Sequence, residues 1–342
     1  MIDLRSDTVT RPCRAMREYM LDAAVGDDVF GEDPTVNRLQ EVTATLLGKE
    51  AALFVPSGCM GNEICIRVLT NPGDELICDA ESHIINYEAG AMAMLSGVQH
   101  RPVYQTNGIL TADAIKELIR PSTYYFPSSR LIALENTHNM AGGIVTPLPV
   151  IEEIAKLARD HQLKTHLDGA RLWHASTASG VSVAEYARHF DSVMVCFSKA
   201  LGAPVGSAIA GTTSFIDEAR RVRKQFGGAM RQAGILAAAC LFGLDNNREK
   251  LETDHENAFH LADMISGARN IELDMQMVQT NIVIFSYKGN QTSDEACQHL
   301  QNRGVQLIPV GEKRVRAVTH LDVSKKDIEA AATMIINEFD QE

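Results

Sequence analysis

Short apolar runs alternate with longer amphipathic segments through the first two-thirds of the chain. The runs are apolar almost throughout rather than at every second position, and they lie at 51–55, 75–78, 130–135, 164–168 and 192–197. Continuous apolar character is typical of strands buried on both faces of a parallel sheet. Residues 150–162, between two of these runs, carry apolar side chains three and four positions apart, which indicates a helix. The pattern predicts an open α/β sheet with helices on both faces.

The later part of the chain has a different pattern. Residues 206–212 follow the run at 192–197 too closely for a helical crossover, so we expect an antiparallel neighbour there. After residue 250, the predicted helices lie at 255–268, 292–303 and 325–338, and the predicted short strands lie at 281–287, 305–310 and 315–320.

A second domain follows from this change of pattern and from the length of the chain. A single core stops growing near roughly 250–300 residues, and this chain has 342 residues, of which 45% are hydrophobic. We expect a large α/β domain over 15–250 and a small α+β domain over 251–342. Residues 1–14 are expected to form an arm that lines the active site or packs with the small domain.

Composition excludes several classes of protein. The formal net charge of -12 argues against a nucleic-acid partner, because phosphates are bound by basic patches. The seven cysteines are scattered singly without a CxxC pair, so neither a disulfide framework nor a zinc ribbon is indicated. Asp3, Arg5 and Asp7 stand where a signal peptide would be apolar, and no run reaches the ~20 residues of a membrane span. We expect a soluble cytoplasmic protein without a membrane partner.

Polar groups follow the predicted strands at their carboxyl ends, where open α/β sheets bind ligands. Lys199 comes shortly after the run at 192–197 and is followed by small residues such as Gly202. Burying an ammonium is costly, and a desolvated lysine has a lowered pKa and becomes an amine that can form a Schiff base. Lys199 therefore suggests a carbonyl cofactor or substrate, although a solvated lysine is the ordinary alternative.

Asp168 ends another predicted strand, and two interpretations of it stay open. It could cap a helix, since Asp favours that position, or it could face the ring nitrogen of pyridoxal 5'-phosphate (PLP), which needs an acidic partner. Arg171, expected one helical turn further on, could meet an anion in the same cleft. His83 follows the strand at 75–78 and could stack on a ring or move protons, or be an ordinary structural histidine. His166 is expected on the same side of its strand as Asp168, behind the site at most.

The segment PSGCMGN, residues 56–62, passes from a predicted strand into a predicted helix. Amides at a helix N-terminus beside small residues can hold a phosphate, although such turns also use Ser and Gly for geometry alone. The chain has neither a GxGxxG nor a GxxxxGK[ST] motif, so a single phosphate fits better than a dinucleotide. No metal-ligand spacing is present, and no metal is predicted.

Several blocks of sequence together resemble the threonine aldolases, of the low-specificity and L-allo-threonine type. The blocks are LRSDTVTRP (4–12), VGDDVFGEDPTVNRLQ (25–40), PSGCMGN (56–62), ENTHN (135–139), HLDGARLW (166–173), SKALGAPVGS (198–207), GGAMRQAGILAAA (227–239) and VTHLDVS (318–324). The resemblance implies a PLP-dependent enzyme of fold type I, the aspartate aminotransferase type, with a mostly parallel seven-stranded sheet. It implies cleavage of L-threonine or L-allo-threonine to glycine and acetaldehyde, as in glycine formation or amino-acid breakdown.

The resemblance also assigns roles to individual residues. Lys199 would bind the cofactor covalently, Asp168 would pair with the pyridine nitrogen, and His83 would stack on the ring and attend the substrate hydroxyl. The phosphate would be held by Ser57, Gly58 and Cys59, with Arg231 from a neighbouring subunit, and the substrate carboxylate by Ser6, Arg171 and Arg316. A site completed by two chains implies a homo-oligomer, and a tetramer built as a dimer of dimers is favoured.

Three positions depart from the family pattern. Cys59 stands where Thr is common, Phe30 where many relatives have Tyr, and Tyr125 where some have His. Another fold type I enzyme acting on a small amino acid is the alternative: a β-eliminating lyase, a phenylserine aldolase or an aminotransferase. A binding protein built on an inactive relative is a further alternative, against which the intact Lys199 and Asp168 argue.

Overall fold

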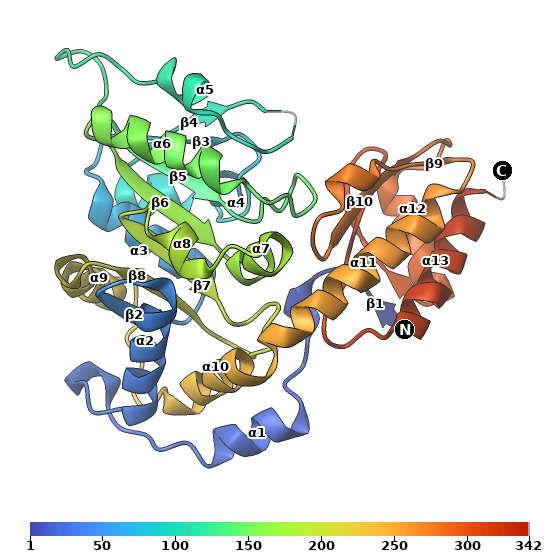
Figure 1. Ribbon diagram of the computed structural model, residues 1–342, viewed down its shortest axis with the longest axis horizontal. Helices are drawn as coiled ribbons and strands as arrows, with labels where there is room; N and C mark the ends of the chain where they lie inside the picture. Colours follow the sequence, from blue (N-terminus) through green and yellow to red (C-terminus); the bar gives the residue numbers. More distant parts are fainter. Residues whose placement is uncertain (106, 341–342) are drawn as a thin grey trace.

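The computed structural model describes residues 1–105 and 107–340. It has a larger part built on a seven-stranded sheet and a smaller part built on a four-stranded sheet, joined in Figure 1 by the long helix α11 (Leu251–Ser266). A separate hydrophobic core fills the smaller part. The domain boundary near residue 250 stays a prediction, although helix α11 begins at that point.

The larger sheet has the strand order β2-β8-β7-β6-β5-β3-β4. The strands are β2 (Ala51–Val55), β3 (Glu75–Asp79), β4 (Gln99–Val103), β5 (Ser129–Glu135), β6 (Lys164–Gly169), β7 (Ser192–Cys196) and β8 (Ser207–Gly211). The runs predicted as strands are confirmed, and so is the antiparallel strand at 206–212, because β8 pairs antiparallel with both β2 and β7. Strand β4 was not predicted, since a segment that contains His100, Arg101 and Pro102 is only partly buried at the sheet edge.

Helices cover both faces of this sheet, as the burial of its strands requires. They are α1 (Arg14–Leu21), α2 (Pro34–Leu47), α3 (Gly58–Leu69), α4 (His83–Asn86), α5 (Ala112–Lys116), α6 (Leu148–Asp160), α7 (Leu172–Ser179), α8 (Val183–Ala187), α9 (Thr213–Gln225) and α10 (Gly234–Asn246). Successive residues of β2 point to opposite faces: Leu53 packs in the cluster that holds α3 and α9, and Phe54 packs in the main core on the other side. This alternation follows from the two-residue period of a strand.

The smaller sheet has the strand order β12-β13-β10-β9. Its strands are β9 (Ile271–Glu272), β10 (Ile282–Tyr287), β12 (Ile308–Gly311) and β13 (Arg314–Val318), and with α11 its helices are α12 (Ser293–Arg303) and α13 (Lys325–Phe339). The single strand predicted at 305–310 is wrong. Val305–Gln306 form β11, which pairs with β1 (Ile2–Asp3), whereas β12 pairs with β13. The chain changes partners here, and Pro309 lacks a backbone N–H, which suits an edge strand.

The first residues of the chain belong to both parts. Strand β1 pairs parallel with β11 in the smaller part (Figure 1), and Leu4 is buried in that core. The chain then crosses toward the larger sheet, where Asp7 is completely buried. Within residues 1–105 and 107–340, no helix is long and apolar enough to cross a membrane.

Candidate active site

The carboxyl ends of β5, β6 and β7 meet at one edge of the larger sheet. These strands are parallel neighbours, and Glu135 at the end of β5 lies in register with Asp168 at the end of β6. Lys199 follows the end of β7 by three residues. Strand β2 runs in the same direction as β7, because β8 between them is antiparallel to both, so Ser57 also leaves the sheet at this edge. The topology therefore gathers the predicted groups on one side.

Asp168 is buried, with 3% of its surface exposed. Its Oδ2 accepts a hydrogen bond from Asn62 Nδ2 at 2.9 Å, and its Oδ1 accepts one from the backbone N–H of Ala170 at 3.0 Å. The capping alternative is wrong, because α7 begins at Leu172 and its N-cap is Arg171. Both donors to Asp168 are neutral, and no cation pairs with it in the part of the chain that the structure describes. A buried carboxylate without a counter-charge is costly, so this position fits a cationic ring nitrogen.

Asn62 on α3 links Asp168 to two further groups. Its Nδ2 also donates to Glu88 Oε1 at 2.9 Å, and its Oδ1 lies 3.1 Å from His166 Nε2. Burial lowers the pKa of His166 to about 4, so a neutral imidazole donates from Nε2 to the Asn62 oxygen. His166 thus lies behind Asp168, as expected from their spacing.

His83 begins α4 and is oriented by a carboxylate. Its Nδ1 lies 2.9 Å from Glu88 Oε1, and because a carboxylate only accepts, Nδ1 carries the proton and Nε2 of the neutral ring is left free. Burial opposes protonation of His83, but the hydrogen bond to Glu88 and the charges of Asp168 and Glu135 together raise the pKa of the imidazole. His83 is therefore a base with a defined tautomer and an increased affinity for protons.

Lys199 is half-buried in the turn that follows β7. The backbone closes this turn with a hydrogen bond from Gly202 N–H to the Lys199 carbonyl at 2.9 Å. Across the residues described by the structure, the Lys199 amine has no hydrogen bond or ion pair. An unpaired amine at this edge fits covalent binding of a carbonyl group.

The segment predicted to hold a phosphate forms the N-terminus of α3. Ser57 is its N-cap, and the Ser57 hydroxyl oxygen accepts from the Met60 N–H at 3.2 Å. The backbone N–H groups of Gly58 and Cys59 have no acceptor among the described residues, and such amides favour an anion. Partial desolvation and the charges of Glu88 and Asp168 raise the pKa of the exposed Cys59 thiol to about 11, so it stays neutral beside a phosphate. A Cβ on Gly61 would lie 2.8 Å from Met194 Cγ, so a small residue lets the helix approach the sheet closely.

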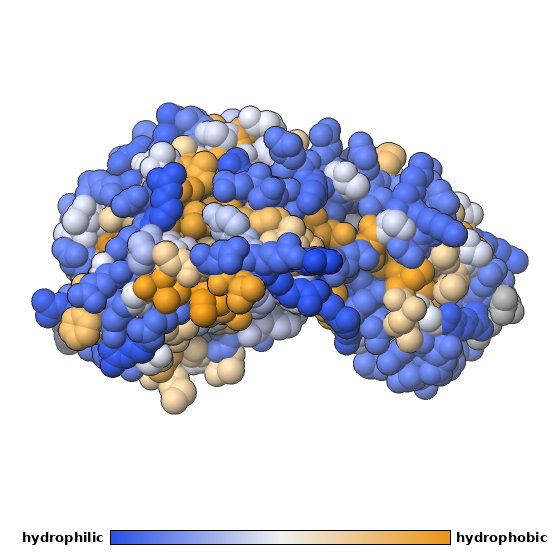
Figure 2. Space-filling model, turned by 90° about the horizontal axis from the view of Figure 1, so that it is seen from below, coloured by the Kyte–Doolittle hydropathy of each residue, from blue (hydrophilic) through white to orange (hydrophobic). Residues whose placement is uncertain are grey.

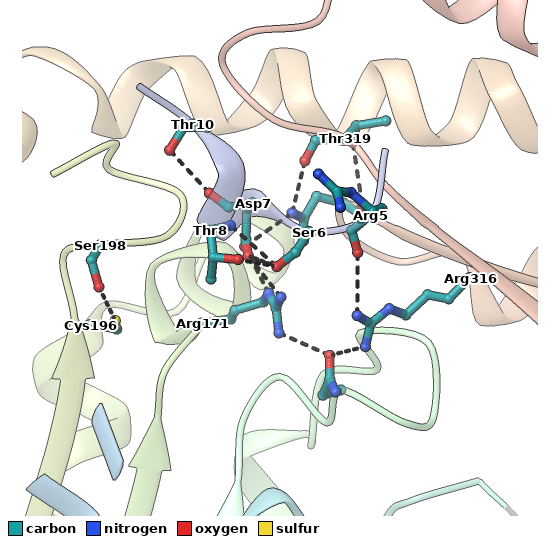
Figure 3. Close-up of polar contacts among 12 residues, drawn as sticks. Arg5, Ser6, Asp7, Thr8, Thr10, Arg171, Cys196, Ser198, Arg316 and Thr319 are labelled. Carbon is teal, nitrogen blue, oxygen red and sulfur yellow. Dashed lines mark hydrogen bonds and ion pairs between the residues drawn. The ribbon is translucent and has the colours of Figure 1, made fainter. Parts of the chain in front are cut away.

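A second group of residues consists of Asp7, Asn139, Arg171 and Arg316, and we call it the carboxylate clamp after the role predicted for its two arginines. Arg171 donates from Nε and Nη2 to the two oxygens of Asp7, both at 2.8 Å, and from Nη1 to Asn139 Oδ1 at 3.0 Å. Figure 3 shows Asp7 and Arg171 facing each other. Burial opposes ionisation of Asp7, but Arg171 and, less strongly, Lys199 hold the pKa of that carboxyl far below its ordinary value. The expected place of Arg171 one helical turn beyond Asp168 is wrong, because Arg171 precedes α7.

Arg316 on β13 completes the clamp and differs from Arg171. Its Nη1 donates to Asn139 Oδ1 at 3.0 Å and its Nη2 donates to the Arg5 carbonyl at 3.3 Å (Figure 3). Its Nε is buried without a partner, and no carboxylate pairs with it in the described ranges. Burial and the nearby charge of Arg171 lower the pKa of Arg316 to about 10. Arg316 is therefore a buried cation that lacks an anion.

The chain is similar along most of its length to proteins of one family. A family model described as beta-eliminating lyase matches residues 3–288. A low-specificity L-threonine aldolase of Arabidopsis thaliana is 44% identical over 334 residues, which are 96% of this chain and 93% of the relative. The chain belongs to the threonine aldolase family. Enzymes of this family depend on PLP, and this member is accordingly a PLP-dependent carbon–carbon lyase.

Solved structures agree on the fold. A threonine aldolase of Leishmania major has a TM-score of 0.83 at 20% identity, with 98% of each chain covered. A serine palmitoyltransferase variant of S. paucimobilis with bound PLP has a TM-score of 0.77 at 18% identity, covering 98% of this chain and 87% of that one. The predicted fold type I is confirmed.

The threonine aldolase site has groups without partners that correspond to the functional parts of PLP. Among residues 1–105 and 107–340, Asp168 has no cation, the amides of Gly58 and Cys59 have no anion, and the Lys199 amine has no partner. These match a pyridinium nitrogen, a phosphate and an aldehyde, respectively. The residues that are present therefore fit the cofactor.

Two sets of residues remain to be compared with the expectations from the sequence: Arg231 and Ser6, to which the resemblance assigned roles, and several polar residues to which the sequence assigned no role in the site. Arg231 is exposed and pairs with Asp27 at 3.0 Å, and it makes no described hydrogen bond to the phosphate cradle. Ser6 lies next to the clamp, where its Oγ accepts from the Thr8 N–H at 3.2 Å. Polar residues that orient the site, none of which was singled out, are Asp7, Asn62, Glu88, Glu135 and Asn139. Asp7, Asn62, Glu135 and Asn139 lie in blocks that mark the family, and Glu88 lies five residues after His83. That proximity was the available signal.

Proposed function

We propose that this threonine aldolase cleaves L-threonine, L-allo-threonine or both to glycine and acetaldehyde by breaking the Cα–Cβ bond. The observation that carries the proposal is that an unpaired amine, Lys199, and a buried cation without a described anion, Arg316, both lie close enough to Asp7 for their charges to interact with it. An α-amino acid bound to the cofactor has a carboxylate to offer that cation. The name of the Arabidopsis relative, a low-specificity L-threonine aldolase, supports the same substrate.

The cofactor would be held at several points by this chain. Lys199 would bind its aldehyde carbon through Nζ, Asp168 would hold a proton on its ring nitrogen, and His83 would lie against the ring. The phosphate would be bound by Ser57, Gly58 and Cys59. Bound PLP supplies an electron-withdrawing ring that stabilises negative charge on Cα of an attached amino acid.

The carboxylate clamp would orient the substrate for the bond that must break. Asp7 already neutralises Arg171, so Arg316 provides the net positive charge that attracts the substrate carboxylate, with Arg171 and Ser6 beside it. Fixing the carboxylate fixes rotation about the bond between Cα and the amine nitrogen. The clamp would thereby select the Cα–Cβ bond as the bond at Cα that is presented for cleavage.

His83 would move the proton that the cleavage requires. Its Nε2 is free because Nδ1 donates to Glu88 Oε1. Nε2, directly or through a water molecule, takes the proton of the β-hydroxyl while the Cα–Cβ bond breaks and the aldehyde C=O forms.

The experiment that tests this function combines a visible spectrum of the purified protein with product analysis. Each threonine epimer is added, and acetaldehyde is detected by reduction with alcohol dehydrogenase and NADH. We expect a cofactor band that changes with substrate and acetaldehyde that equals the glycine formed. Ammonia together with an oxo acid would instead indicate a β-eliminating lyase. An oxo acid without ammonia would indicate an aminotransferase. Benzaldehyde from phenylserine, without acetaldehyde from either threonine epimer, would indicate a phenylserine aldolase.

We also propose a cytoplasmic homo-oligomer, favouring a tetramer built as a dimer of dimers, with the active sites at subunit interfaces and Arg231 contributed by a neighbouring subunit. Large apolar side chains are exposed near α1 and in the loop that follows it, including Leu21 at 83% and Phe30 at 72%. Figure 2 shows apolar side chains gathered on this side of the larger part. Light scattering of the holoenzyme tests the proposal, and a monomer would contradict it.

A further inference from the structure

Glu135 accepts hydrogen bonds from two segments that lie on different sides of the proposed substrate position. Its Oε2 accepts a hydrogen bond from the backbone N–H of His83 at 2.8 Å, and its Oε1 accepts one from the backbone N–H of Asn139 at 2.9 Å. Glu135 is the last residue of β5, so its own position is fixed by the sheet. A single carboxylate at a rigid strand end thus holds the first residue of α4 and the loop that follows β5.

The Asn139 end of this connection leads directly to the carboxylate clamp. Asn139 Oδ1 accepts from Arg171 Nη1 and from Arg316 Nη1, both at 3.0 Å. Movement of the Asn139 backbone would therefore displace the acceptor shared by both guanidinium groups. Through Asn139, Glu135 sets where the clamp stands relative to the sheet.

The His83 end leads to the imidazole that faces the β-carbon in the proposed function. Glu88 fixes the rotation of this ring through Nδ1, whereas Glu135 fixes the backbone from which the ring projects. The charge of Glu135 is also among those that raise the pKa of His83. Backbone position and ring rotation are thus controlled by two different carboxylates.

We propose that Glu135 is a positioning residue that sets the distance between the carboxylate clamp and His83, and thereby sets how the enzyme discriminates between L-threonine and L-allo-threonine. This inference rests on the proposed function. The two epimers share the carboxylate, the amine and Cα, and they differ only in the direction of the hydroxyl on Cβ. Once the clamp has fixed the carboxylate, the position of the imidazole relative to the clamp decides which epimer places its β-hydroxyl in good hydrogen-bond geometry with Nε2. The discrimination equals the difference between the transition-state free energies for L-threonine and for L-allo-threonine, and the position of the imidazole changes that difference.

Glu135 can serve both ends only because each of its oxygens is an acceptor. In Glu135→Gln one oxygen becomes an NH₂ group, which faces a backbone N–H donor, so one of the two bonds is replaced by a donor–donor contact. In Glu135→Asp the charge is kept, but the side chain is shorter by one methylene and cannot reach both amides. Both variants are therefore expected to separate the clamp from His83, one through polarity and the other through length.

The test measures kcat and KM of the holoenzyme for both epimers in the wild type, Glu135→Gln and Glu135→Asp. We expect the ratio of the two kcat/KM values to change by about tenfold or more in both variants, within the range that contact geometry controls. Cofactor content, read from the visible spectrum, should stay close to wild type, because the side chains of Lys199, Asp168 and Ser57 make no described hydrogen bond to Glu135. Glu75→Gln is the matched control, since Glu75 is equally a strand carboxylate but lies at the other end of the sheet, where it pairs with Arg120.

The outcomes separate this inference from the proposed function. A wild-type ratio in either Glu135 variant, with both epimers slowed equally, would overturn the role of Glu135 while leaving the function intact. A comparable change of the ratio in Glu75→Gln would also overturn it, because general loosening of the fold would then be the cause. Failure of the wild type to cleave either epimer would overturn the proposed function itself, and the inference with it.

Discussion

The two halves of the site are built in different ways. The proposed cofactor pocket, meaning Ser57, His83, Asp168 and Lys199, is built from residues within four positions of the carboxyl ends of strands of one sheet. The carboxylate clamp is built from the N-terminal arm, the loop after β5, the start of α7 and strand β13 of the smaller sheet. Strand order alone brings the first set together, whereas the second set needs both parts of the molecule in place.

The two halves also differ in how their charges are balanced. In the cofactor pocket the charged groups of Asp168 and Lys199 have no protein counter-ion among the described residues, so a bound group must supply the balance. In the clamp Asp7 balances Arg171 internally, whereas Arg316 has no anion in the described part of the chain. The comparison indicates that residues of the pocket serve binding and chemistry, whereas part of the clamp also holds the fold.

The largest effect is expected at Lys199. Lys199→Ala removes the amine, and Lys199→Arg keeps a positive charge but lacks a nucleophilic amine, because a guanidinium stays protonated. We expect both variants to lose turnover and the substrate-sensitive visible band, with unchanged thermal unfolding of the protein without cofactor. Turnover retained by either variant would remove Lys199 from the centre of the cofactor pocket.

A smaller loss is expected at His83. His83→Asn removes the proposed base, and kcat should fall by roughly 10²–10⁴-fold, the usual range for a general base. His100→Asn, a change of an exposed histidine on β4, is the control and should leave kcat unaltered. An unchanged kcat in His83→Asn would show that another group takes the proton.

The two arginines of the clamp provide a direct comparison. Arg316→Gln removes the cation without an anion, so KM should rise by about 30-fold or more, as for loss of one partner of a buried charge pair. Arg171→Gln should likewise raise KM, and it also leaves the buried Asp7 carboxylate without its cation. The free energy of unfolding should therefore fall by about 3–5 kcal/mol in this variant. Steady-state kinetics and urea unfolding measure the two effects. Equal unfolding midpoints in the two variants would contradict the structural role of the Asp7–Arg171 pair.

The smallest effect concerns pH. Because the pKa of His83 is raised, kcat/KM should fall on the acid side as Nε2 becomes protonated, with a midpoint above the ordinary value of about 6.5. Glu88→Gln keeps an amide oxygen for His83 Nδ1 but removes a negative charge, so the acid limb should move to lower pH. The pH dependence of kcat/KM for both proteins tests this. An acid limb that stays in place would mean that Glu88 is not what raises the pKa of the imidazole.

The sequence predicted the cofactor pocket better than the clamp, and the reason is physical. A buried parallel strand leaves a continuous apolar run, so its carboxyl end can be located, and a polar residue there is a candidate ligand. Lys199, Asp168 and His83 were found in this way. Asp7 and Asn139 follow no such rule, because Arg171 lies 164 positions from Asp7 and Arg316 lies 177 positions from Asn139. Glu135 does end a predicted strand, but its partners are backbone N–H groups, which residue type does not reveal.

The strand errors have a related origin. Strand β4 contains Arg101 and Pro102 and lies at a sheet edge, where apolar continuity is not required. The segment 305–310 divides between two pairings, one of them with the first residues of the chain. A pairing between residues 2 and 305 leaves no local signal, since hydrophobic pattern reports burial and not the identity of the neighbour.

By itself the sequence determined the α/β class, most of the strands, the strand-end groups that fit PLP and the family, because burial and local chemistry are written in residue type and spacing. Only the tertiary structure decided that Asp7 pairs with Arg171, that Arg316 is left without an anion, and that Glu135 connects His83 to the clamp. Those contacts depend on which groups lie close together in the water-free interior. An ion pair or a hydrogen bond there forms between groups that are near in space, wherever they stand in the chain.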